Sequence, residues 1–290
     1  MSGIELQRLT STGDTTSLKL VVAEGNTLSE PIQHELYTII LQSGGTGVFQ
    51  ADFGRFPFRG PVILFATPLQ TICVEGDPDH QAVLQFHGDF YCIEYHKQEV
   101  ACNGVLFNNI YTDPTVVLTS EQFTFFDRIL GDIGKELSDP QAADAVLTAY
   151  LQLFLAKATT IKTQSPTLPA ERDEIMEQFR ELIEAHFLAL RRPAAYADLL
   201  HISPNTLTKR CRQYFRKTPT ELIQERIVLE AKRGLHLSRR SVKEIAHELN
   251  FEDEHYFSRF FKKITGVTPL AFRQKTGISV VADLSSNNPE

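Results

Sequence analysis

The stretch LTKRCRQYFRKTP, residues 207–219, is followed fifty residues later by a related stretch, FSRFFKKITGVTP, residues 257–269. In the second copy Phe257, Phe261 and their apolar neighbours recur at helical spacing, which predicts an amphipathic helix with one buried face. Helices can resemble one another through their buried faces alone, but here polar positions recur as well. The chain therefore contains two related helices whose outer faces are also related.

The outer faces of these two helices carry polar and cationic side chains at the offsets 0, 3, 4 and 7, which lie on one helical stripe. The stripe holds Asn205, Thr208, Lys209 and Arg212 in the first copy, and His255, Ser258, Arg259 and Lys262 in the second. A solvated helix face is the ordinary explanation of each cation taken alone. The repeated register favours contact with DNA instead.

Each striped helix follows a shorter helical segment and a tight turn. The segment YADLLHI, residues 196–202, corresponds to IAHELNF, residues 245–251. His201 and Asn250 stand in the turns, and both belong to the few residue types that tolerate positive φ. A helix, a short turn and a second helix with a polar outer stripe is the helix-turn-helix plan, in which the second helix enters the major groove of DNA.

Capping signals predict where the helices begin. Ser203-Pro204 and Asp253 precede the striped helices, and Ser241 with Glu244 forms a capping box before the second short helix. A further helix is predicted from Pro219 to about Leu235. It could pack on both helix-turn-helix halves of this region through its apolar residues Leu222, Ile223, Ile227 and Ala231. If it holds the striped helices about one DNA turn apart, roughly 34 Å, one chain reads two successive major grooves.

Residues 171–275 resemble the AraC/XylS-type bacterial transcription regulators, and the resemblance lies in YADLLHISPNTLTKRCRQYF and SVKEIAHELNFEDEHYFSRFFKKITGVTPLAFR. The second segment is similar to the C-terminal signature of that family. His201 and Asn250 occupy turn positions where the family usually has glycine. Glu254 stands where other members present an uncharged base-reading residue. It could accept from cytosine N4, or it could be a solvated acid in the first helical turn.

The candidate DNA-binding residues are Asn205, Thr208, Lys209, Arg212, Glu254, His255, Ser258, Arg259 and Lys262. We expect base-edge contacts from Asn205, Thr208, His255, Ser258 and Arg259. Arg212 and Lys262 lie further along their helices and are expected to contact phosphates, and Lys209 could do either. Phe257 and Phe261 are expected in the core and not as stacking platforms.

The first part of the chain has a different pattern. Short β-like runs such as ELYTIILQSGGTGVFQADF and GPVILFATP, separated by turns, predict a sandwich or a small barrel. The glycine-rich segment 44–47 is predicted to be a hairpin turn, because no helix or GK[ST] follows it as in a phosphate loop. Ser120 is predicted to begin a helix, and Asp139-Pro140 to begin a second one that ends near Ile161.

We therefore expect an α+β multidomain chain. Residues 1–118 form a β domain for sensing or dimerisation, 119–163 a helix pair and possible dimer interface, and 164–170 a linker. Residues 171–276 form an all-α domain with two helix-turn-helix units joined by a long helix, and 277–290 are a tail. The family resemblance implies that the β domain is a small cupin-like barrel.

The charge is split along the chain, whose net charge is −7. Residues 1–170 hold 9 Lys and Arg against 19 Asp and Glu, whereas residues 203–275 hold 16 against 8. Chance asymmetry is one explanation. The other is that only the basic back half meets a polyanion.

A metal site is the main alternative to this assignment. Cys92, His96 and Cys102 are three soft ligands within 11 residues, but their spacing matches no established zinc pattern, and core or rim positions are the expectation. His80 and His87 are too far apart for the His-x-His pair of a metal-dependent cupin enzyme. We predict no cofactor, no metal and no enzyme activity.

The predicted function is a sequence-specific, effector-responsive DNA-binding transcription regulator. Its predicted partners are double-stranded promoter DNA, a small-molecule effector, RNA polymerase if it activates, and a second copy in a homodimer. The scattered cysteines and the absence of a signal pattern or a long apolar run predict a cytoplasmic protein without membrane contact. The alternatives are a cupin-type metalloenzyme with a helical appendage and a non-specific architectural DNA binder, although charge alone would need no Asn or Thr in the stripes.

Overall fold

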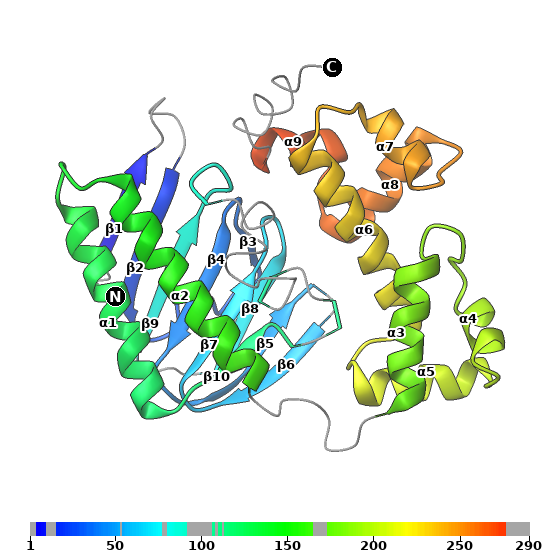
Figure 1. The fold of residues 1–290 in the computed structure, drawn as a ribbon, viewed down its shortest axis with the longest axis horizontal. Helices are drawn as coiled ribbons and strands as arrows, with labels where there is room; N and C mark the ends of the chain where they lie inside the picture. The colour runs from blue at the N-terminus through cyan, green and yellow to red at the C-terminus, as the bar shows by residue number, and fades with distance from the viewer. Residues whose placement is uncertain are drawn as a thin grey trace. The chain divides into compact units, whose positions relative to one another are not determined.

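The structure is a computed structural model that describes residues 4–9, 16–52, 54–76, 80–91, 106–107, 110–111, 113–164 and 173–276. The chain divides into two compact units (Figure 1). The first unit comprises Met1–Asn109 and Asp113–Ser165, and the second comprises Ile110–Thr112 and Pro166–Glu290. The predicted tail, 277–290, and nearly all of the predicted linker lie outside the described residues.

The first unit contains two antiparallel sheets. The larger has the strand order β1 (Ile4–Leu9), β2 (Thr16–Glu24), β9 (His80–Phe86), β4 (Tyr37–Gln42), β7 (Val62–Ala66) and β10 (Thr115–Val117). The smaller has the order β3 (Ile32–Gln33), β8 (Thr71–Gly76), β5 (Thr46–Ala51) and β6 (Gly54–Arg59). The short runs predicted from the sequence are thus confirmed as strands.

Strand β4 shows how the larger sheet separates two cores. Every residue from Tyr37 to Gln42 is buried, because successive side chains point to opposite faces and both faces are covered. Ile39 and Leu41 pack with the helices α1 (Ser120–Ser138) and α2 (Asp144–Gln164), whereas Ile40 packs with residues of the smaller sheet. Figure 1 shows these two helices lying over one face of the larger sheet.

The glycine-rich turn after β4 is not a hairpin, so that prediction was wrong. Strand β4 pairs with β7 and β9, while β5 pairs with β6 and β8, so the turn carries the chain from one sheet to the other. Gly45 has a φ of 87°, and its carbonyl accepts from the Gly60 N–H at 2.8 Å. Strand, turn and strand give the same local pattern whether the strands pair with each other or with different partners.

The helix pair begins as predicted but is divided differently. Thr119 caps α1 in a capping box with Gln122. The prediction that Asp139-Pro140 begins the second helix was wrong, because α2 begins at Asp144. Asp139 instead caps the end of α1 and accepts from the Gln141 N–H at 2.9 Å, and Asp followed by Pro suits such a turn as well as a helix start.

The second unit is all-α, as expected, and its helices in the described residues surround one long helix. They are α3 (Glu174–His186), α4 (Pro193–Leu199), α5 (Pro204–Tyr214), α6 (Pro219–Leu237), α7 (Val242–Glu248), α8 (Glu254–Thr265) and α9 (Pro269–Thr276). Helix α6 contacts α3, α4 and α5 as well as α7, α8 and α9. Its residues Leu222, Ile223, Ile227 and Ala231 are buried, which confirms the prediction that it packs on both halves.

No helix in the described part of the chain has both the length and the apolar character needed to cross a membrane.

Lys162 of α2 is a partly buried cation in the first unit. Its ammonium donates to the carbonyl oxygens of Thr115, at 2.6 Å, and of Asp113. Burial lowers the pKa of Lys162 from 10.5 to about 8, and the nearby Asp113 carboxylate offsets only part of this effect.

We expect the free energy of unfolding of the first unit to rise relative to a Lys162→Met variant as the pH is raised from about 8 to about 10. In that window the unfolded chain holds a proton that the folded chain has released, so stability increases with pH, here by about 1–3 kcal/mol. Scanning calorimetry of both proteins between pH 7 and pH 10 measures the difference. A difference that does not change with pH would contradict the assignment.

Candidate nucleic-acid interface

The two turns that precede α5 and α8 have the same geometry. The Ile202 N–H donates to the Ala197 carbonyl at 3.0 Å, and the Phe251 N–H donates to the Ala246 carbonyl at 2.9 Å. These bonds span five residues, which requires a left-handed residue in between. His201, with a φ of 54°, and Asn250, with a φ of 56°, occupy that position. Both turns are thus tight C-terminal caps that direct the chain into the following helix.

Helix α5 is oriented by its cap and by its buried face. The Ser203 side chain accepts from the Thr206 N–H at 3.1 Å, as the sequence predicted. Leu207 and Cys211 are completely buried. On the other side, Asn205, Lys209 and Arg212 are exposed and Thr208 is half-buried, with its hydroxyl donating to the Pro204 carbonyl at 2.9 Å.

Helix α8 repeats this arrangement. The Asp253 carboxylate accepts from the N–H groups of His255, at 2.9 Å, and Tyr256, at 3.1 Å, and these bonds lower the pKa of Asp253. Phe257 and Phe261 are completely buried. The stripe lies opposite them, with His255, Arg259 and Lys262 exposed and with Ser258 and Glu254 half-buried.

The two stripes match in exposure as well as in sequence. At the offsets 0, 3, 4 and 7 both helices are exposed, half-buried, exposed and exposed. The match follows from the buried residues, because each helix buries the two positions at offsets 2 and 6. The structure thus gathers the predicted residues of each stripe on one face of one helix, and the two stripes lie on separate helices.

Arg259 is an exposed cation of the second stripe. Its side chain is 72% exposed, and its nearest carboxylate in the described structure is Asp253, at 3.9 Å. An exposed ion pair at this distance contributes little free energy. The guanidinium can therefore turn toward another acceptor at small cost.

Several cations of the basic back half are used inside the domain. Arg210 pairs with Asp173 at 3.1 Å, and Lys217 pairs with Glu225 at 2.6 Å. Arg226 bonds Glu184 at 2.9 Å, and the Arg273 guanidinium donates to the Leu235 carbonyl at 3.2 Å. The surplus of basic residues in the sequence therefore overstates the charge that faces solvent. The exposed stripes therefore define the candidate interface better than the count of basic residues does.

Arg191 is a positioning residue that the sequence did not reveal. Its guanidinium donates to the carbonyl of Asn250, at 2.8 Å, and to that of Leu249, and it lies 3.9 Å from the centre of the Phe251 ring. It thereby holds the turn before α8 from a segment 58 residues earlier in the chain. No local pattern marks such a contact.

Metal chemistry finds no support in the described residues, where no cluster of three or more His, Cys, Asp or Glu side chains could hold an ion. His80, at the start of β9, lies 3.9 Å from the Asp127 carboxylate, and burial lowers the pKa of His87 after the same strand. The candidate zinc ligands Cys92, His96 and Cys102 lie outside the described residues. The structure therefore does not test the zinc alternative.

Comparisons with known proteins agree with this geometry. Residues 196–275 match the family model of a helix-turn-helix domain. The chain is 26% identical over 260 residues to the transcriptional activator RhaR of Cronobacter sakazakii, covering 84% of this chain and 86% of RhaR. It is 31% identical over 124 residues to the arabinose operon regulatory protein of Salmonella typhimurium, covering 42% and 43% of the two chains.

A third relative is the uncharacterized HTH-type transcriptional regulator YisR of Bacillus subtilis, 24% identical over 149 residues and covering 51% of this chain and 50% of YisR. The chain thus spans about half the length of YisR and less than half of the arabinose regulator. Residues 196–275 are a helix-turn-helix domain. This domain is of the AraC type, which confirms the resemblance seen in the sequence.

The left-handed turn before α5 can be tested with two substitutions at His201. Replacing His201 with Gly removes the steric cost of positive φ, and we expect the second unit to gain about 0.5–1 kcal/mol of stability. Replacing it with Val, whose branched Cβ fits this region poorly, is expected to cost about 1–2 kcal/mol. Thermal unfolding followed by circular dichroism measures both. A valine variant as stable as the natural protein would show that the turn does not need this conformation.

Proposed function

We propose that this protein is a sequence-specific DNA-binding transcription regulator whose helices α5 and α8 read two successive major grooves. The observation that carries the proposal is the matching exposure of the two stripes, each set opposite a completely buried face. An α-helix fits the major groove, and side chains near its N-terminus reach base edges there. The relatives described above are named as transcriptional activators or regulators, which supports the same function.

The stripes suggest a division of roles. Asn205, Thr208, His255, Ser258 and Arg259 begin in the first turns and are proposed to contact base edges. Arg259 suits a bidentate contact with guanine. Arg212 and Lys262 lie one or more turns further on and are proposed to contact phosphates, and Lys209 suits either target. Glu254, half-buried in the first turn of α8, is proposed to accept from cytosine N4.

The first unit is proposed to be a cupin-like sensor that also mediates dimerisation. A small-molecule effector can regulate DNA binding only if it binds the active and inactive states with different affinity. RNA polymerase would be a further partner if the protein activates transcription. The proposal includes no covalent chemistry, and stoichiometric iron, manganese or zinc in the purified protein would favour the metalloenzyme alternative.

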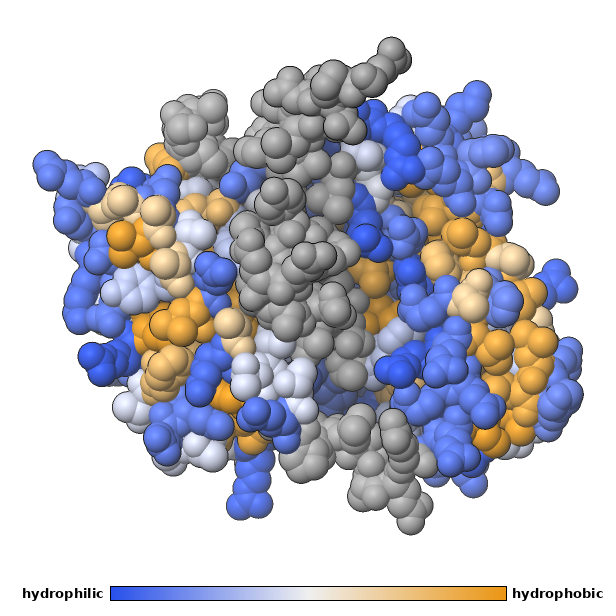
Figure 2. Space-filling model, viewed as in Figure 1, coloured by the Kyte–Doolittle hydropathy of each residue, from blue (hydrophilic) through white to orange (hydrophobic). Residues whose placement is uncertain are grey.

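The helix pair offers a surface for the proposed dimer. Val146 and Leu153 of α2 are 39% and 48% exposed and lie seven residues apart, on one side of the helix. Figure 2 shows hydrophobic residues gathered over α1 and α2. Exposed apolar patches on a surface helix commonly mark protein contacts.

The proposed reading of DNA predicts different effects for Arg259 and Lys262. The preferred duplex is first selected from a random pool by the full chain at physiological salt. Arg259→Ala is expected to weaken binding to that duplex by about 1–3 kcal/mol and to relax the preference at one base position. Lys262→Ala is expected to weaken binding to all sequences alike. The slope of the logarithm of the binding constant against the logarithm of the salt concentration is expected to become shallower by about 1.

The matched control is Arg128→Ala, which removes an exposed arginine from α1 of the first unit and should leave DNA affinity unchanged. Unchanged affinity in Arg259→Ala and Lys262→Ala would contradict the site assignment. Recovery of no motif, with equal affinity for all duplexes, would favour the architectural binder instead.

The proposed dimer predicts that Leu153→Lys shifts the protein from dimer to monomer, because a charge replaces apolar surface at the contact. Sedimentation velocity over a range of concentrations measures the change, which we expect to be at least about tenfold in the dimer dissociation constant. Leu270→Lys, which changes a similarly exposed leucine on α9, should leave the dimer intact. A Leu153→Lys protein that dimerises as tightly as the natural one would exclude this surface.

A further inference from the structure

A three-residue segment of the chain belongs to a different unit from its neighbours in sequence. The range Ile110–Thr112 is part of the second unit, whereas the chain before it, to Asn109, and after it, from Asp113, is part of the first. We call the described residues of this range, Ile110 and Tyr111, the strap. Both are half-buried.

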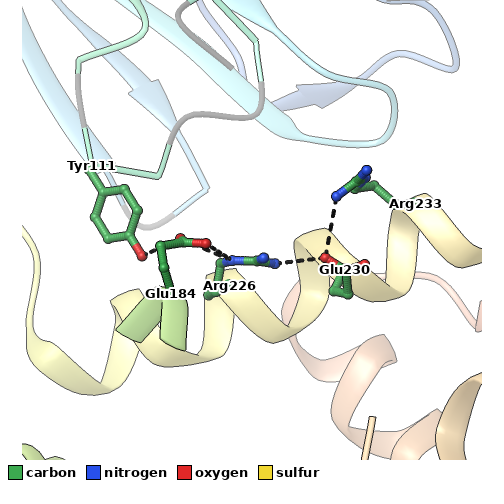
Figure 3. A network of polar contacts seen from close by, with 5 residues as sticks. All are labelled: Tyr111, Glu184, Arg226, Glu230 and Arg233. Atoms are coloured by element: carbon green, nitrogen blue, oxygen red, sulfur yellow. Dashed lines mark hydrogen bonds and ion pairs between the residues drawn. The ribbon is translucent and has the colours of Figure 1, made fainter. Parts of the chain in front are cut away.

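Tyr111 holds the strap through a chain of polar contacts. Its hydroxyl donates to the Glu184 carboxylate of α3 at 2.7 Å. The same carboxylate accepts from Arg226 Nε of α6 at 3.0 and 2.9 Å. Arg226 Nη1 also donates to the Glu230 carboxylate at 3.0 Å, and Arg233 Nη1 lies 3.5 Å from the same carboxylate (Figure 3).

The protonation states suit this chain of contacts. Burial raises the pKa of Tyr111, and the hydrogen bond to Glu184 raises it further, so the phenol stays protonated and donates. Burial alone would lower the pKa of Arg226, but its bonds to Glu184 and Glu230 outweigh that effect and raise it. Hydrogen bonds between charged partners are stronger than neutral ones.

Ile110 is held by its backbone. Its carbonyl accepts from Lys217 Nζ at 3.1 Å, and the same ammonium bonds the Glu225 carboxylate of α6 at 2.6 Å. The Lys217 side chain is only 7% exposed. A buried charge requires such partners, because leaving one unpaired costs several kcal/mol. The strap therefore completes the environment of a buried cation.

Together the two strap residues contact α3 and the end of α5, and they reach α6 through the partners of Glu184 and Lys217. Tyr111 reaches α3 through Glu184, and its ring lies 5.9 Å from Phe215, which caps the end of α5. The partners of Glu184 and Lys217 lie on α6, the helix that contacts both halves of the unit. None of these contacts uses a stripe residue.

The chain beyond the strap is anchored in the first unit. Asp113 follows Tyr111 after one residue, and its carbonyl accepts from Lys162 of α2, as does that of Thr115 in β10. A displacement of α2 or β10 thus reaches Tyr111 through only a few backbone bonds.

We infer that the strap couples the state of the first unit to DNA binding by the second. This rests on the proposed function. The strap seats when α3, the end of α5 and α6 hold the arrangement seen here, and the same arrangement places α5 for DNA. Seating of the strap and DNA binding therefore favour each other, and by linkage each strengthens the other by the same factor.

The test is hydrogen–deuterium exchange of the full chain, measured by mass spectrometry with and without its selected duplex. We expect the duplex to slow exchange in α5 and α8, by direct contact, and also in residues 113–117 and at the end of α2, through the strap. In Tyr111→Ala the slowing in the first unit is expected to disappear while that in α5 and α8 persists. The affinity for the duplex should fall about fivefold or more, with an unchanged sequence preference.

Two further variants distinguish coupling from a general loss of packing. Tyr111→Phe keeps the ring beside Phe215 but loses the hydrogen bond to Glu184. In this variant we expect the duplex to slow exchange in residues 113–117 less than in the natural protein. Tyr214→Phe removes a similar hydrogen bond, which Tyr214 donates to Glu177 of the same helix α3 at 2.9 Å. In this variant we expect the slowing in residues 113–117 to be unchanged.

The outcomes separate this inference from the proposed function. No slowing in α5 or α8 of the natural protein would overturn the proposed function and the coupling with it. Two outcomes would overturn the coupling alone. In the first, the duplex slows exchange in α5 and α8 but not in residues 113–117. In the second, it slows exchange in residues 113–117 as well, and the Tyr111→Ala variant shows the same slowing.

Discussion

Burial of one face of α5 and one face of α8 is the constraint on which the DNA-binding unit depends. Leu207 and Cys211 in one helix, and Phe257 and Phe261 in the other, lose all contact with solvent. Because a helix places positions three and four apart on one side, fixing these residues also fixes where the stripes point. The polar stripes thus owe their direction to apolar packing and not to any contact of their own.

The same packing gives α6 its place in the structure. It lies between the two halves, contacts the helices of both, and carries the arginine that bonds the strap partner Glu184. A helix buried along one side resists bending, since any change of angle would open voids in a closely packed interior. The packing of α6 against both sets of helices thus opposes a change in their separation.

Features that depend on residues close together in the sequence were predicted correctly, and features that depend on distant residues were not. Helix starts at Ser203 and Asp253, and the turns at His201 and Asn250, depend on residues a few positions apart and were predicted correctly. The turn after β4 was misjudged because pairing of a strand depends on partners elsewhere in the chain.

The contacts of Arg191 and the strap were missed for the same reason. Arg191 bonds a carbonyl 58 residues away, and Lys217 bonds one 107 residues away, and neither leaves a periodic signal in the sequence. The candidate DNA surface, in contrast, is a repeated local pattern on two helices. Its members could therefore be named in advance, although their roles toward DNA stay predictions.

The two striped helices, joined by α6, are proposed to enter successive major grooves on one side of the DNA. The most direct measurement is the affinity of the full chain for its selected duplex when five base pairs, about half a turn, are inserted between the two half-elements. We predict that affinity falls to the level of unrelated duplexes, because the second half-element is turned to the opposite side. Affinity that is unchanged by the insertion would contradict the claim.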